Sequence, residues 1–100
     1  MDKKTIRQEL KDIRFYFSRK KSFDKASMEL GNNLVATKIM KYNVAIKNAT
    51  PRLYDLYYSL YIDNNTIQSL ADKYCFSYGY VKNLNTKLIS FFTEKFKDVA

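Results

Sequence analysis

The chain has 100 residues, a formal net charge of +8, a single Cys and no His. This length suits one domain, or a small domain with an arm. The lack of His, of a phosphate-binding glycine motif and of a set of metal ligands argues against an enzyme, and we expect neither a metal nor a cofactor. A lone Cys cannot form an internal disulfide, so we expect a reducing compartment.

The positive charge suits a polyanionic partner, which is either nucleic acid or an anionic membrane surface. The alternative is a protein that is merely lysine-rich. The sequence has no apolar run long enough to span a membrane, and its first ten residues are too charged for a signal peptide. We therefore expect a cytoplasmic protein with no membrane partner. A membrane-surface role for the first helix is a minor alternative.

The first predicted helix covers residues 3 to about 21. Its apolar residues recur every three or four positions and so share one face. They are Ile6, Leu10, Ile13 and Phe17. The run Arg19, Lys20 and Lys21 lies at the end of this helix, where positive charge is favourable to the helix dipole. The same three residues are candidate phosphate contacts, and the two interpretations remain open.

Residues 22–33 are compatible with a helix, and Gly31, Asn32 and Asn33 indicate its stop. Residues 34–48 predict another helix, with apolar residues again three or four positions apart. They are Val35, Ile39, Tyr42 and Ile46. The pattern leaves open whether the two segments form one kinked helix or two helices.

Thr50 and Pro51 are the clearest helix start in the chain, because Thr is a good N-cap and Pro is favoured at the first helical position. This helix should run to Ile62 and end in the polar turn at residues 63–65. Its apolar side comprises Leu53, Leu56, Tyr57 and Leu60. Its tyrosines are too many for one buried stripe, so some should face a partner or the N-terminal helices. They are Tyr54, Tyr57, Tyr58 and Tyr61.

Two further helices separated by three residues predict a helix-turn-helix in the C-terminal half. Thr66 should cap the short first helix, and Ser77 should cap the long second one after a turn at residues 75–77. One face of the short helix comprises Ile67, Leu70, Ala71 and Tyr74. The long helix shares a side through Val81, Leu84, Leu88 and Phe91 or Phe92. The small Ala71 lets the helices cross closely, above a core of Ile67, Leu70, Phe76, Val81 and Leu84.

This arrangement leaves an outward face on the second helix, and we predict that this face contacts DNA. It comprises Ser77, Tyr78, Gly79, Lys82, Asn83, Thr86 and Lys87. Residues 77–93 contain no Asp or Glu, as expected of a helix that lies against phosphates. Asn and Lys can read base edges, and Ser, Thr and Tyr can bond phosphates or bases. Lys73, on the preceding helix, is a candidate phosphate contact.

Residues 51–92 resemble region four of bacterial sigma factors, and more closely the small phage transcriptional regulators of the RinA, ArpU and LtrC type. The positions that carry the resemblance are Tyr57-Tyr58, Tyr61-Ile62, Thr66, Ile67-Gln68-Ser69-Leu70-Ala71, Tyr74, Ser77, Val81 and Leu84. The resemblance covers less than half of the chain. It implies a sequence-specific DNA-binding transcriptional regulator, a phage or mobile-element activator that acts with RNA polymerase in the cytoplasm of a bacterial host. The alternative is a small basic helical protein that binds and modulates a host or phage protein.

Two positions depart from the pattern. The turn of the family usually carries Gly where this chain has Cys75, so the turn is either strained or built differently. Gly79 lies early in the second helix, where Gly is unfavourable. It would permit close approach of DNA or of another helix, or it would relieve crowding between Tyr78 and Tyr80.

The charge is unevenly divided. Residues 1–50 hold twelve Lys and Arg and five Asp and Glu, a net +7, whereas residues 51–100 hold six and five, a net +1. We expect a basic helical segment over residues 1–49 and the sigma-like module over residues 50–100 to form one compact all-α bundle of about five helices. Either the N-terminal helices flank the DNA, or RNA polymerase or homodimerisation holds a weakly binding module in place.

Overall fold

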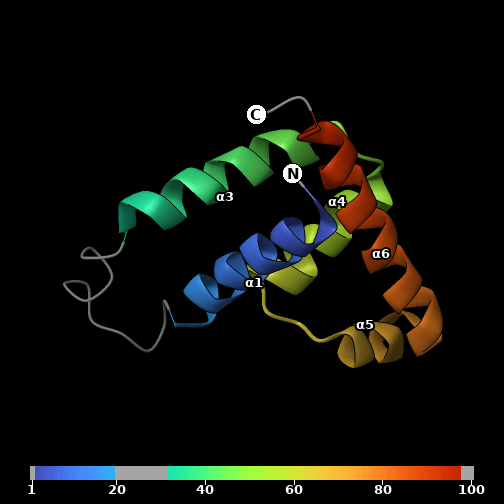
Figure 1. The fold of residues 1–100 in the computed structure, drawn as a ribbon. Helices are drawn as coiled ribbons and strands as arrows, with labels where there is room; N and C mark the ends of the chain where they lie inside the picture. The colour runs from blue at the N-terminus through green and yellow to red at the C-terminus, as the bar shows by residue number, and fades with distance from the viewer. Residues whose placement is uncertain (1, 20–31, 98–100) are drawn as a thin grey trace.

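The computed structural model describes residues 2–19 and 32–97, and every regular element in these segments is helical (Figure 1). The elements are α1 (Lys3–Arg19), α3 (Asn32–Ile46), α4 (Pro51–Tyr57), η1 (Tyr58–Ile62), α5 (Ile67–Tyr74) and α6 (Tyr78–Lys95). Because the π-helical η1 continues α4, the described segments form five helices, as the sequence predicted. Asn32 and Asn33, which the sequence assigned to a helix stop, instead begin α3; Gly31 and the proposed helix before it lie outside the described residues.

The core joins both halves of the chain. Ile6, Leu10 and Ile13 of α1 are buried, which confirms the predicted apolar stripe. They share one cluster with residues of α3, α4, η1, α5 and α6. Aromatic rings meet at its centre, where the ring of Phe92 lies 4.7 Å from that of Tyr42 and 5.7 Å from that of Tyr57, centroid to centroid. Large aromatic surfaces thus supply much of the burial available to a small domain.

The buried tyrosines keep a hydrogen-bond partner for each hydroxyl. Tyr42 donates to Glu9 Oε1 at 2.8 Å, and Tyr57 donates to Asn43 Oδ1 at 2.7 Å. The second bond confirms that a tyrosine of the helix after Pro51 faces the N-terminal helices. Burial raises the pKa of both hydroxyls, and the adjacent Glu9 carboxylate raises that of Tyr42 further.

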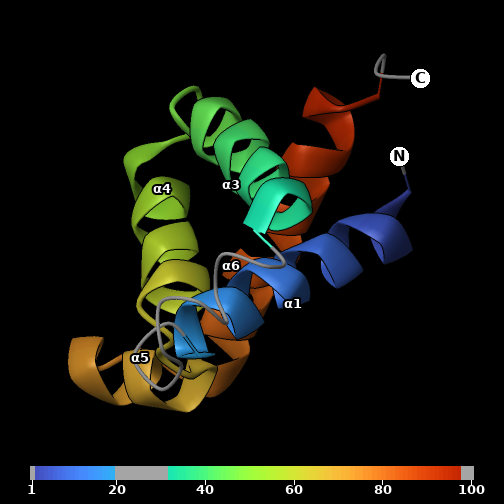
Figure 2. The ribbon, with the colours of Figure 1, turned by 90° about the vertical axis from the view of Figure 1, so that its left-hand side faces the viewer.

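Arg14 joins α1 to the chain between η1 and α5. Its Nε donates to the carbonyl oxygen of Leu60 at 3.0 Å, and its Nη2 donates to those of Asn64 at 3.3 Å and Asn65 at 3.2 Å. Asn64 has a φ of 62°, which Asn tolerates better than most residues, so the predicted polar turn is a sharp one. The guanidinium satisfies carbonyl oxygens that no longer have helical partners, and thereby fixes where α5 begins. In both ribbon views α5 lies at the opposite end of the molecule from the last turn of α6 (Figures 1 and 2).

Candidate nucleic-acid interface

The structure forms the predicted helix-turn-helix from α5, a three-residue turn and α6. Thr66 Oγ1 accepts from the Ser69 amide at 3.0 Å, and Ser69 Oγ accepts from the Thr66 amide at 3.1 Å, which is a reciprocal capping box. Ser77 Oγ accepts from the Tyr80 amide at 3.1 Å and caps α6. Ala71 is 2% exposed, as expected of a small residue at a helix crossing.

Cys75 adopts the left-handed conformation, with φ 59° and ψ 35°. The amide of Cys75 donates to the Asp72 carbonyl at 3.5 Å, and that of Phe76 donates to the Ala71 carbonyl at 2.9 Å. This pair of bonds is the Schellman arrangement that usually places Gly at the left-handed position. The turn therefore keeps the geometry of a glycine turn, and Cys75 carries the strain, typically about 1–2 kcal/mol for a residue with a Cβ.

The sequence prediction was wrong for two aromatic residues of this unit. Tyr74 is 51% exposed and Phe76 is 38% exposed, although both were assigned to buried faces. Leu70, Ala71 and Val81 occupy the buried crossing, and the left-handed turn leads Phe76 toward α4 instead. Phe76 packs there against Tyr80, with ring centroids 4.9 Å apart, and beneath the Arg52 guanidinium at 5.5 Å.

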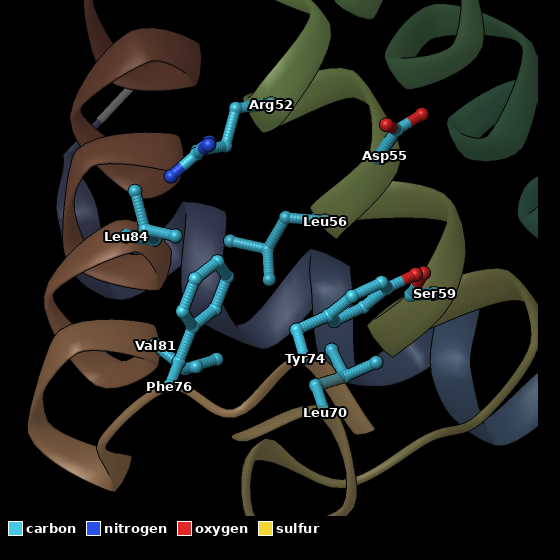
Figure 3. A pocket seen from close by; sticks show the side chains of 9 residues that line it. All are labelled: Arg52, Asp55, Leu56, Ser59, Leu70, Tyr74, Phe76, Val81 and Leu84. Carbon is cyan, nitrogen blue, oxygen red and sulfur yellow. The ribbon is translucent and has the colours of Figure 1, made fainter. Parts of the chain in front are cut away.

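These aromatic side chains border a pocket of about 190 Å³ between α4 and the helix-turn-helix, which we call the aromatic pocket (Figure 3). Its lining residues are Arg52, Asp55, Leu56, Ser59, Leu70, Tyr74, Phe76, Val81 and Leu84. Arg52 also donates to the Tyr80 hydroxyl, so its guanidinium lies at the rim. Six of the lining side chains are aliphatic or aromatic, and Arg52 and Asp55 supply its charged groups.

All seven residues predicted to contact DNA are exposed along the first three turns of α6 and its cap. They are Ser77, Tyr78, Gly79, Lys82, Asn83, Thr86 and Lys87. We call this surface the α6 face. The Thr86 hydroxyl donates to the Lys82 carbonyl at 3.2 Å, within the helix. Among the residues that the structure describes, a Cβ at Gly79 would meet no atom of another element within 4 Å, so none of the described helices approaches this glycine closely.

The predicted phosphate contacts lie in different places. Lys73 is exposed on α5, with Nζ 5.3 Å from the Tyr74 ring centroid. Arg19 is the last residue of α1, and its guanidinium lies 4.7 Å from the Phe15 ring centroid. Its position agrees with the helix-dipole interpretation. Lys20 and Lys21 lie outside the described residues.

A second basic surface, which the sequence interpretation missed, lies directly beside α6. Lys11 and Arg14 of α1 line a groove of about 550 Å³ with residues of η1, α5 and α6. The other lining residues are Leu60, Tyr61, Asn65, Thr66, Ile67, Gln68, Tyr78 and Asn85. We call it the basic groove. None of these lining residues is acidic, and Tyr78 belongs to the α6 face as well, so the two surfaces are continuous.

The charges of α1 are divided between two neighbours. Asp12 Oδ2 forms an ion pair with Lys38 Nζ of α3 at 3.1 Å. Glu9 Oε1 forms another with Lys41 Nζ, also of α3, at 3.7 Å. On the other edge, Arg7 and Arg14 lie close enough to the Tyr61 hydroxyl to oppose the rise in its pKa that burial causes. The acidic edge of α1 therefore faces α3, and its basic edge faces η1 and α6. The spacing of Arg7, Lys11 and Arg14 was the available signal in the sequence, since residues three and four apart share a helix edge.

Comparisons with known protein families, with curated proteins and with solved structures find no match to this chain. Among the residues that the structure describes, no helix combines the length and apolar character needed to cross a bilayer. The same residues contain no group of three or more His, Cys, Asp or Glu side chains that could hold a metal ion.

Proposed function

We propose that this protein binds double-stranded DNA through its helix-turn-helix, with the α6 face in the major groove, and regulates transcription. The observation that carries the proposal is the α6 face itself: seven exposed residues on three consecutive turns, in a stretch from residue 77 to 93 without one carboxylate. Lys82 and Asn83 lie one turn from the start of α6, where a recognition helix reaches base edges. The proposal extends the resemblance to phage activators that work with RNA polymerase.

Asn83 provides the test for sequence reading. Asn pairs with adenine through two hydrogen bonds, and a good bidentate contact contributes roughly 1–3 kcal/mol of discrimination. A duplex selected from random DNA by the wild-type protein would be compared with scrambled duplex. Asn83→Ala should lower the preference for the selected sequence at one base position and leave the salt dependence of binding unchanged, because Asn carries no charge.

The control for Asn83 is Glu94→Gln, which changes an exposed residue near the other end of the same helix. It should leave base preference as it is. If the wild-type protein binds no duplex at low salt, or if selection from random DNA yields no preferred sequence, the protein does not read DNA through α6.

The aromatic pocket favours a second candidate function, which is binding of a protein. Two of its lining residues, Tyr74 and Phe76, are exposed aromatic side chains (Figure 3). The Arg52 guanidinium lies over the rings of Phe76 and the neighbouring exposed Tyr80. Exposed aromatic residues and Arg are enriched where proteins contact each other. A contact with RNA polymerase, a homodimer contact, or modulation of a host or phage protein would each use such a site. Wild-type binding to random duplex over a salt series separates the candidates, since phosphate contacts weaken steeply with salt.

A further inference from the structure

The basic edge of α1 comprises Arg7, Lys11 and Arg14. The proposed contact of the α6 face with DNA does not involve the positive charge of this edge. Residues 51–100 carry a net charge of only +1, so the helix-turn-helix has few phosphate contacts of its own. The charge resides in residues 1–50, and two of the acidic side chains there, Glu9 and Asp12, are paired with α3. The positive side chains on the opposite edge of α1 face the unit that carries the α6 face.

The position of this edge is fixed by contacts. The Arg14 guanidinium donates to the carbonyl oxygens of Leu60, Asn64 and Asn65. These bonds fix α1 against η1 and against the turn before α5. Arg7 and Lys11 precede Arg14 by seven and three positions, on the same edge, and both are exposed. Lys11 lines the basic groove together with Tyr78, which is the point where the groove meets the α6 face.

The partner must be a row of negative charges that passes along the groove. A DNA strand that borders an occupied major groove presents such a row, with one phosphate per nucleotide. Phosphate contacts account for much of the affinity of proteins for duplex DNA. The groove also offers uncharged donors. The Asn85 side-chain oxygen accepts from Tyr61, which leaves its amide group as a donor, and Tyr78 is a further lining residue that carries a hydroxyl.

We propose that Arg7 and Lys11 bind the phosphate backbone of the DNA strand that borders the major groove occupied by α6. The inference rests on the proposed function, because it assumes that α6 enters the groove. It assigns to α1 the nonspecific part of the affinity, and to α6 the specific part. Arg19 is not part of this contact surface, since it is neither a lining residue of the basic groove nor on the edge of Arg7 and Lys11.

The test measures binding of the full chain to random-sequence duplex over a series of KCl concentrations. Each lost phosphate contact reduces the magnitude of the negative slope of log affinity against log salt by about 0.9. The double variant Arg7→Gln/Lys11→Gln should therefore reduce this magnitude by about two units. The matched control is Lys47→Gln/Lys97→Gln, which removes the same charge from exposed residues where α3 and α6 end, away from α5. Its slope should equal that of the wild type.

A third variant, Lys82→Gln/Lys87→Gln on the α6 face, separates the two proposals. Absence of wild-type binding at low salt overturns the proposed function. A shallower slope for the α6 variant with a wild-type slope for the α1 variant leaves the proposed function in place and overturns the inference. An equal loss in the Lys47 and Lys97 control also overturns it, because the effect would then reflect net charge alone. The charge-preserving variant Arg7→Lys/Lys11→Arg should restore the wild-type slope, and failure to restore it means that the Gln variant acts through folding.

Discussion

The two halves of this chain are organised by different kinds of contact. The C-terminal unit is defined locally: Thr66 and Ser77 cap its helices within three residues of themselves, and the turn between them closes through backbone bonds. The N-terminal helices are positioned by contacts with distant residues, such as those of Arg14 with the chain some fifty positions further on. The local unit thus presents the α6 face, whereas the long-range contacts decide which charges lie beside it.

The largest expected effect tests whether the two halves depend on each other. Arg14→Met keeps much of the apolar stem but removes the donors to three carbonyl oxygens. Hydrogen bonds to a charged group contribute roughly 1.5–3 kcal/mol, so the free energy of unfolding should fall by about 3 kcal/mol in urea titrations followed by circular dichroism. Arg14→Lys should recover only part of this, because an ammonium lacks the planar fork.

Amide hydrogen exchange shows which helices Arg14→Met destabilises. Amides of α5 should lose protection more than those of α3, since Arg14 fixes the turn before α5. If Arg14→Met unfolds at the same urea midpoint as the wild type, the position of the helix-turn-helix does not depend on the hydrogen bonds from α1.

The second prediction concerns the aromatic core where the halves meet. Tyr42 and Tyr57 are buried, and their raised pKa keeps them neutral in the folded protein at a pH where the unfolded chain ionises, near the ordinary value of 10. The contribution of these two neutral hydroxyls to the free energy of unfolding is complete below about pH 10 and is lost as the pH rises above that value. The free energy of unfolding should therefore fall by about 1.4 kcal/mol per pH unit for each tyrosine.

In Tyr42→Phe the free energy of unfolding should fall less steeply above about pH 10, by the ~1.4 kcal/mol per pH unit that one tyrosine contributes. Tyr74→Phe is the control, because the Tyr74 side chain is exposed at 51%. Urea titrations between pH 8 and about 11.5 measure both, in the range where these groups titrate. Equal alkaline slopes for wild type and Tyr42→Phe would show that the hydroxyl of Tyr42 does not remain neutral in the folded state.

The smallest expected effect lies within the local unit. Cys75→Gly removes the Cβ from a left-handed residue and should raise the free energy of unfolding by up to about 1 kcal/mol, after allowance for the greater freedom of Gly in the unfolded chain. Thermal unfolding measures it, with Cys75→Ala as the control that keeps the Cβ. A lower melting temperature for Cys75→Gly than for Cys75→Ala would contradict the strain assigned to this turn.

The same contrast explains what could be predicted from the sequence. Caps and helix periodicity depend on neighbouring residues, so the starts at Pro51, Ile67 and Tyr78 and the exposure of the α6 face followed from local patterns. The exposure of Tyr74 and Phe76 did not, because it depends on α4 and on the turn at Cys75. The basic groove was missed for a related reason. The spacing of Arg7 and Lys11 shows that they share an edge, but only the packing of α3 against Glu9 and Asp12 shows which way that edge faces.

The left-handed turn has a practical consequence for measurement. Cys75 is the only cysteine in the chain, and it is exposed between α5 and α6. A thiol-reactive fluorophore would therefore attach at this single position without any substitution. Because the chain has no Trp, its intrinsic emission comes from Tyr and leaves the spectral region of most attached dyes clear. Energy transfer from such a dye to one placed at either end of a duplex would test the proposed docking on DNA, because it reports the direction in which a bound protein lies.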